Sequence, residues 1–239
     1  MARLTTVLFD LDGTLLPMDQ DVFARAYFTA LAGKAATRGY EPETFVKAIW
    51  KGTYAMMKND GSLSNEKLFW RIMVDLFGDR IMQDQDVFDN FYRDDFDKIA
   101  ESCGHNPAAA TAVHAMKDMG LRVALATNPL FPAVATQSRI RWAGLDPTDF
   151  ELYTTYEDYS YCKPSLAYYE TILERLGVSA DECLMVGNDV GEDMVAEKLG
   201  MRVFLLSDCI INKHDADISA YPQGSFDELL AYVRTCISE

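Results

Sequence analysis

Two aspartates two positions apart, Asp10 and Asp12, follow an apolar segment at residues 5–9 and precede Gly13. Side chains two positions apart on an extended chain project to the same side. The carboxyl end of a parallel strand is where open α/β sheets bind ligands. Two carboxylates this close repel each other, so the pair requires a cation or keeps one proton. Both arrangements suit acid–base or metal chemistry, and the alternative is a solvated turn with helix-capping aspartates.

Further polar groups follow the other apolar segments of the chain. They are Thr127 and Asn128, then Lys163 before Pro164, then Asn188, Asp189 and Asp193 after Gly187. Each has an ordinary explanation by itself, as a helix N-cap, an exposed charge or acids that favour a helix start. Pro129 is expected to begin the helix after Thr127. None of them predicts a site on its own.

Four mostly apolar runs, at residues 5–9, 121–126, 183–186 and 202–206, predict strands buried on both faces. A weaker candidate lies at 150–154. Helical spacing fills the later intervals, as at 165–176, where Gly177 is a C-cap. Alternation of strand and helix indicates a parallel α/β sheet with right-handed crossovers.

Residues 17–100 differ, because they show helical stripes and no strand pattern. Roughly 80 residues are too many for a crossover connection, so we expect a separate helical subdomain. Its aromatic stripes are expected to pack in a core, and lining a substrate pocket is the alternative.

Residues 9–15, with the sequence Phe-Asp-Leu-Asp-Gly-Thr-Leu, resemble the first motif of the haloacid dehalogenase superfamily in its phosphatase form. Thr127, Lys163 and the segment 186–193 resemble the later motifs in the same order. The resemblance implies an α/β fold: a Rossmann-like parallel sheet with helices on both faces, formed by residues 1–16 and 101–239. Residues 17–100 would form an α-helical cap subdomain inserted after the first motif.

The resemblance also implies roles in phosphate-ester hydrolysis. Asp10 would be the nucleophile that becomes an aspartyl phosphate, and Asp12 would be the general acid and then the base. Thr127, Asn128 and Lys163 would hold the phosphoryl oxygens. The substrate would be a small phosphorylated metabolite. A sugar phosphomutase or an inactive binding protein on this fold are alternatives, whereas a dehalogenase would have no evident use for Asp12.

Mg²⁺ is the implied cofactor, bound by Asp10, the backbone carbonyl of Asp12 and an acid of the fourth motif. The family usually has aspartate where this chain has Asn188. We expect Asp189 to be the ligand, because an anionic oxygen holds a hard cation better. Asn188 is the alternative ligand, and Asp193 would give support. The acids and a phosphate dianion carry about −5 against Lys163, which favours a divalent cation.

The 239 residues carry a net charge of −15, which argues against nucleic acid as a partner. No apolar stretch approaches the roughly 20 residues of a membrane span, and the first ten residues do not resemble a signal peptide. Five cysteines without a CxxC pair suit a reducing compartment. These features predict a cytoplasmic protein. Cys162 is expected to be a buried inert thiol, the alternative being a thiol activated by Lys163.

Overall fold

A five-stranded parallel sheet forms the centre of the computed structural model, which describes residues 2–238. Met1 and Glu239, at the ends of the predicted core ranges, lie outside the described residues. In spatial order the strands are β2 (Arg122–Leu125), β1 (Thr6–Phe9), β3 (Cys183–Gly187), β4 (Arg202–Leu206) and β5 (Gln223–Gly224). All adjacent pairs are parallel, which confirms the predicted sheet.

Residues 150–154, the weaker strand candidate, run beside β2 without forming a full strand. The Glu151 amide donates to the Val123 carbonyl at 2.9 Å, and Tyr153 forms an isolated parallel bridge with Leu125. The segment is therefore extended along β2, but the predicted fifth strand is not formed there. β5 was not predicted, because a two-residue strand has no readable hydrophobic pattern.

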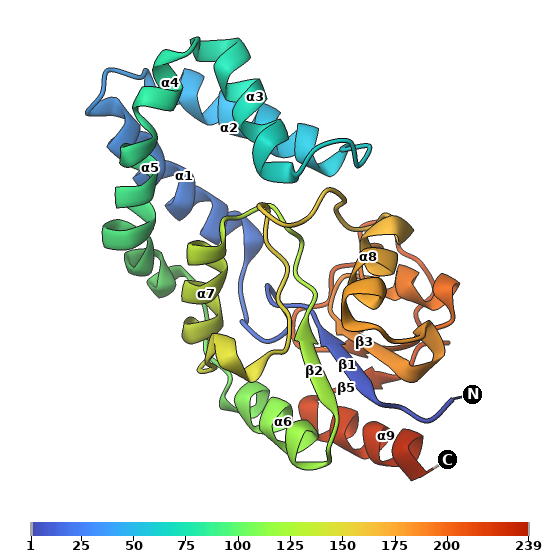
Figure 1. Cartoon of the computed structure of the whole chain (residues 1–239). Coiled ribbons are helices and arrows are strands. Elements are labelled where there is room, and N and C mark those ends of the chain that lie inside the picture. Colours follow the sequence, from blue (N-terminus) through green and yellow to red (C-terminus); the bar gives the residue numbers. More distant parts are fainter. Residues whose placement is uncertain (1, 239) are drawn as a thin grey trace.

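Helices cover both faces of the sheet (Figure 1). Successive side chains of β1 point to opposite faces and so pack with different helices. We call the sheet and the helices that cover it the sheet-bearing part. Its helices are α6 (Pro107–Asp118), α7 (Ala133–Trp142), α8 (Leu166–Leu176) and α9 (Phe226–Ser238). Short 3-10 turns occupy Pro147–Asp149, Ala180–Glu182 and Met194–Leu199. Val7 and Phe9 pack with α6 and α9, whereas Leu8 packs with α8 on the other face. Within residues 2–238, the helices fall short of the length and apolar character that crossing a membrane requires.

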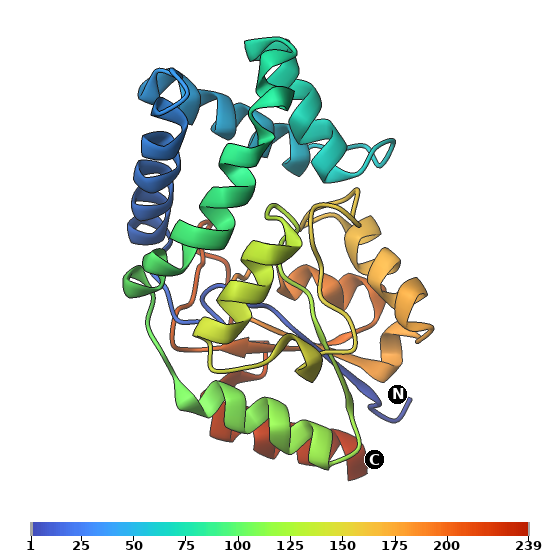
Figure 2. The same ribbon diagram turned by 60° about the vertical axis from the view of Figure 1, so that its left-hand side comes forward.

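A helical group lies over one end of the sheet, as Figures 1 and 2 show. It comprises α1 (Gln20–Ala36), α2 (Pro42–Met57), α3 (Asn65–Phe77), α4 (Arg80–Gln83), α5 (Gln85–Asn90), a π-helical turn at Phe91–Asp95 and a 3-10 helix at Phe96–Ser102. Its aromatic stripes form a core of their own, which also touches Ala135 and Cys162 of the sheet-bearing part. The last 3-10 helix ends at Ser102, so we call residues 17–102 the cap. The division into two domains at residues 17 and 100 stays a prediction.

The two chain segments that connect the cap to the sheet lie next to each other. Met18 and Cys103 form an antiparallel bridge, and the Gly104 amide donates to the Pro17 carbonyl at 2.7 Å. A Cβ at Gly104 would lie 3.1 Å from the Pro17 side chain, so the close approach favours glycine. Both connections therefore form one narrow attachment.

Leu8→Ala is expected to lower the free energy of unfolding by about 2–5 kcal/mol. Leu8 is fully buried on the central strand, and truncation leaves a cavity beneath α8. Val22→Ala is the control, because Val22 is 40% exposed and a surface substitution changes stability by about 0.5 kcal/mol or less. Urea denaturation measures both, and equal effects would contradict this account of the core.

Candidate functional site

The ends of β1, β2 and β3 meet at a cavity of about 570 Å³ between the sheet and the cap. Hydrogen bonds extend the sheet to these ends, since the Asp10 amide donates to the Val186 carbonyl at 2.9 Å. The predicted residues on its wall are Asp10, Asp12, Thr127, Asn128, Asn188, Asp189 and Asp193. The register of three parallel strands thus brings together groups that are far apart in the sequence.

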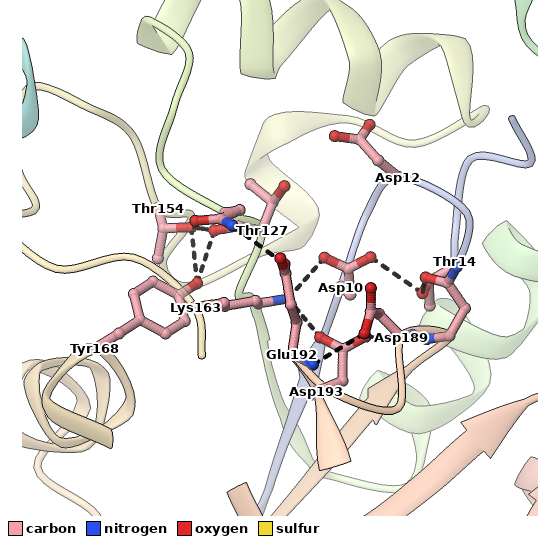
Figure 3. A network of polar contacts seen from close by, with 12 residues as sticks. Asp10, Asp12, Thr14, Thr127, Thr154, Lys163, Tyr168, Asp189, Glu192 and Asp193 are labelled. Atoms are coloured by element: carbon pink, nitrogen blue, oxygen red, sulfur yellow. Dashed lines mark hydrogen bonds and ion pairs between the residues drawn. The ribbon is translucent and has the colours of Figure 1, made fainter. Parts of the chain in front are cut away.

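Lys163 lies beneath the wall of this cavity and is 1% exposed. Its ammonium donates to Asp10 Oδ1 at 2.7 Å and to Asp193 Oδ1 at 2.6 Å (Figure 3). Burial by itself lowers the pKa of Lys163, but these two carboxylates raise it well above its ordinary value. Lys163 is therefore a fixed buried cation that holds the Asp10 carboxylate in place.

Asp193 connects Lys163 to the turn after β3. Its Oδ2 accepts the backbone amides of Asn188 and Asp189 at 3.0 and 2.9 Å. Burial raises the pKa of Asp193 to about 7, and the Lys163 ammonium opposes that rise. A Cβ at Gly187 would lie 2.1 Å from Asp193 Oδ2, so only glycine fits there. Asp193 therefore supports the turn that carries Asn188 and Asp189, whereas its predicted support of a metal site stays a prediction.

Asn188 and Asp189 face different neighbours. Thr14 Oγ1 lies 3.2 Å from Asp10 Oδ2 and 2.9 Å from Asn188 Oδ1, so Asn188 is next to the predicted nucleophile. Asn188 Nδ2 donates to the Cys209 carbonyl at 2.7 Å, which fixes the amide with its oxygen toward Thr14. Asp189 Oδ1 instead accepts two backbone amides of its own turn, at 2.8 and 3.0 Å.

Asp12 forms an ion pair with Arg139, a residue that sequence reasoning missed. Arg139 is fully buried in α7, and its guanidinium lies 4.4 Å from the centre of the Phe131 ring. Burial raises the pKa of Asp12, against the lowering effect of Arg139. Asp12 Oδ1 is buried without a hydrogen-bond partner. The sequence did contain a signal for Arg139. It lies one helical turn after Ala135, on the face of the helix where apolar residues are expected.

Thr127 is held through its backbone. Its carbonyl accepts hydrogen bonds from the hydroxyls of Thr154 and Tyr168, the latter at 2.7 Å, and neither residue was predicted (Figure 3). This anchoring leaves the Thr127 position fixed at the cavity wall. The helix expected to start at Pro129 begins later, at Ala133 with Pro132 as its N-cap. The intervening residues form a loop instead.

Asn128 also lies at the wall and donates to Glu192 Oε2 at 3.1 Å, while its own Oδ1 is buried without a partner. Glu192, which was not predicted either, belongs to the turn after β3, and burial raises its pKa. The contact therefore joins the end of β2 to that turn.

Cys162 is buried, and burial raises the pKa of its thiol to about 12. Asn65 Nδ2 donates to its sulfur at 3.3 Å. The predicted burial of Cys162 is therefore confirmed, and the raised pKa of the thiol argues against its activation by Lys163.

The family model for haloacid dehalogenase-like hydrolases matches residues 4–198. The chain belongs to this family. Solved structures of similar fold include a haloacid dehalogenase (HAD) family phosphatase from Thermococcus onnurineus, with a TM-score of 0.60 and 17% identity over 96% of this chain and 98% of that one. A 2-haloacid dehalogenase from Pseudomonas syringae has a TM-score of 0.63 and 20% identity over 97% and 98%. These likenesses confirm the predicted fold.

Two curated relatives resemble this haloacid dehalogenase-like hydrolase over part of its length. YhcW of Bacillus subtilis is 31% identical over 48% of this chain and 50% of that protein. The glyceraldehyde 3-phosphate phosphatase of Methanocaldococcus jannaschii is 30% identical over 50% and 52%. The matches span about half the length of these relatives.

Lys163→Met is expected to lower the free energy of unfolding of the metal-free hydrolase by about 3–5 kcal/mol near pH 8, because two buried carboxylates lose their cation. The loss should shrink at lower pH. Without Lys163, the pKa of Asp193 in the folded state rises above about 7, well over its value of 3.8 when unfolded. The folded state then binds more protons, so its stability declines as pH rises through that window.

Denaturation at pH 5.5 and pH 8 measures this difference. Lys213→Met is the control, because Lys213 is largely exposed and its ammonium is 3.8 Å from Asp189 Oδ2. Its effect should stay below about 1 kcal/mol. A loss for Lys163→Met that does not depend on pH would contradict the proposed role of the buried pair.

Proposed function

We propose that this hydrolase is a Mg²⁺-dependent phosphatase that cleaves a small phosphorylated metabolite through an aspartyl-phosphate intermediate. The observation that carries the proposal is the placement of Asp10. Its carboxylate lies at the cavity wall, oriented by Lys163 on one oxygen and by Thr14 on the other. A carboxylate fixed in this way is suited to in-line attack on phosphorus.

Asp10 attacks phosphorus, so that a bond from its oxygen forms as the bond to the leaving oxygen breaks. Asp12 gives its proton to the leaving alcohol, and burial supports the protonated form that this step needs. Asp12 then takes a proton from the water that attacks the aspartyl phosphate, releasing inorganic phosphate and free Asp10. Thr127 and Asn128 would hold phosphoryl oxygens at the end of β2. The cap over the cavity would limit competing water.

The donor atoms at the cavity fit a magnesium ion. In residues 2–238 no group of three or more His, Cys, Asp and Glu side chains is arranged to hold a metal. Mg²⁺ sites, however, commonly use one or two carboxylates together with waters and substrate phosphate. Asp10 and Asn188 supply hard oxygens that converge on Thr14. A bound Mg²⁺ would neutralise charge on the phosphoryl group.

We propose Asp10, the Asp12 carbonyl and Asn188 as the protein ligands. The sequence favoured Asp189 for its charge, but one Asp189 oxygen holds the turn and the other is nearest Lys213. The Asn188 oxygen instead lies 2.9 Å from Thr14 Oγ1, which is also 3.2 Å from Asp10 Oδ2. Asp193, engaged by Lys163 and two amides, would support the loop.

A sugar phosphomutase is less well supported, because its bisphosphate intermediate needs a second anion site. Four basic residues of the cap that could meet a second anion are exposed and are not among the residues that line the cavity: Arg25, Lys47, Lys51 and Lys58. An inactive binding protein is disfavoured by the engaged Lys163–Asp10 pair. The cytoplasmic location and the exclusion of nucleic acid stay predictions.

Asp10→Asn is expected to reduce phosphate release from an aryl phosphate by about 10³-fold or more, because an amide cannot form the acyl phosphate. Wild-type activity should disappear with a chelator and return with Mg²⁺. Phosphate release is measured colorimetrically, and the unfolding curve of the variant checks its fold. Metal-dependent activity retained by folded Asp10→Asn protein would exclude Asp10 as nucleophile.

Asn188→Ala is expected to weaken Mg²⁺ binding by about tenfold or more, measured by calorimetry. Asp189→Asn should leave the affinity nearly unchanged, since its amide oxygen still accepts the turn amides. The reverse ranking would identify Asp189 as the ligand, as its charge suggested.

A further inference from the structure

The cavity has two chemically different ends. The polar groups of Asp10, Asp12 and Thr127 form the end at the sheet. The other end is made by the cap and is predominantly aromatic. Its lining residues include Phe28, Trp50, Trp70, Phe88 and Tyr92 of the cap, and Phe131 joins them from the loop before α7.

The aromatic rings are held by contacts with one another. The centroids of Phe28 and Trp50 are 4.9 Å apart, and those of Trp70 and Phe88 are 5.2 Å apart. Phe88 is buried in the cap core, whereas Trp50 is 52% exposed and lies at the edge of the cavity. The sequence left two roles open for the aromatic stripes, packing in a core and lining a pocket. Several of these rings have both roles, since they pack in the cap and also line the cavity. Aromatic walls bind planar rings by stacking and edge contacts.

The charges on the cap side of the cavity are negative. Glu66, Asp89 and Glu157 line it there. Burial raises the pKa of Glu66, and the nearby Glu157 adds to this effect. Lys213, which also lines the cavity, is at the opposite end, near Asp189. A second phosphate or a carboxylate on the substrate would therefore meet acids and rings in the cap, with no cation among the lining residues there.

We propose that the substrate is a monophosphate ester whose alcohol carries a planar ring and no second anionic group, with nucleoside 5′-monophosphates as the class that fits. This inference rests on the proposed phosphatase function and adds its leaving-group preference. The phosphate lies at Asp10, and the ring lies against Trp50 and Phe28 in the cap. A cavity of about 570 Å³ is in the usual range for a small organic ligand.

The experiment compares three substrates with Mg²⁺ present. Uridine 5′-monophosphate has a ring, glycerol 3-phosphate has neither ring nor second anion, and 3-phosphoglycerate has an added carboxylate. We expect kcat/KM to fall in that order. Trp50→Ala should raise KM for the nucleotide by about tenfold, because stacking on the base is lost. The same variant should change kcat/KM for glycerol 3-phosphate much less, because that substrate has no ring to lose its contact with Trp50.

Tyr54→Ala is the matched control. Tyr54 is on the same helix one turn later, is 61% exposed and is not among the cavity-lining residues. It should affect neither substrate. Because Trp50 is half exposed, its removal should preserve the fold, and the ranking of the three substrates on the wild-type enzyme tests the proposal without any variant.

The outcomes separate this inference from the function on which it rests. Release of phosphate from none of the three substrates would overturn the phosphatase proposal and this one with it. Turnover of 3-phosphoglycerate or glycerol 3-phosphate equal to or above that of the nucleotide would overturn only the ring preference. An equal effect of Trp50→Ala on nucleotide and glycerol 3-phosphate would do the same.

Discussion

The buried ammonium of Lys163 between Asp10 and Asp193 is the contact on which the site depends. One of its carboxylates is at the cavity wall, and the other holds the turn after β3 through two backbone amides. The lysine thereby ties the end of β1 to the end of β3 with side chains that are almost inaccessible to water. Ion pairs of this kind add little net stability, but each member is costly to lose because its partner stays buried and charged. We therefore interpret the Asp10–Lys163–Asp193 contact as one that fixes the positions of the site residues rather than one that stabilises the fold.

The cavity assigns separate tasks to the two parts of the chain. The strand ends supply short polar side chains whose positions are fixed by the sheet and by anchors such as Tyr168 on the Thr127 carbonyl. The cap supplies rings, which recognise shape and area rather than charge. In the proposed reaction the phosphoryl group would be handled by the first part and the leaving group by the second. The Arg139–Asp12 pair is at the junction, since Arg139 also stacks on Phe131 of the cavity wall.

Much of the fold could be predicted because buried parallel strands are continuous apolar runs, and the insertion after β1 is plainly helical. The meeting of Asp10 with Asn188 and Asp193 followed from strand ends sharing one edge. What remained beyond reach depended on side-chain direction. In the sequence, Arg139 resembles many other arginines on helices. Only the structure shows that it is buried and paired with Asp12. The choice of Asn188 or Asp189 as the proposed metal ligand likewise depends on which side chain accepts the backbone amides of the turn. The amino-acid sequence does not show this.

The paired connections at residues 17–18 and 103–104 make the cap an exchangeable module. An insertion whose two ends are already adjacent can be replaced by another whose own ends meet, provided that the replacement also packs against Ala135 and Cys162 of the sheet-bearing part. Grafting another helical bundle at this junction would change the cap side of the cavity while Asp10, Thr127 and Lys163 keep their places on the sheet-bearing part. In a directed-evolution experiment, the cap residues that line the cavity could be randomised while the residues at the strand ends are kept.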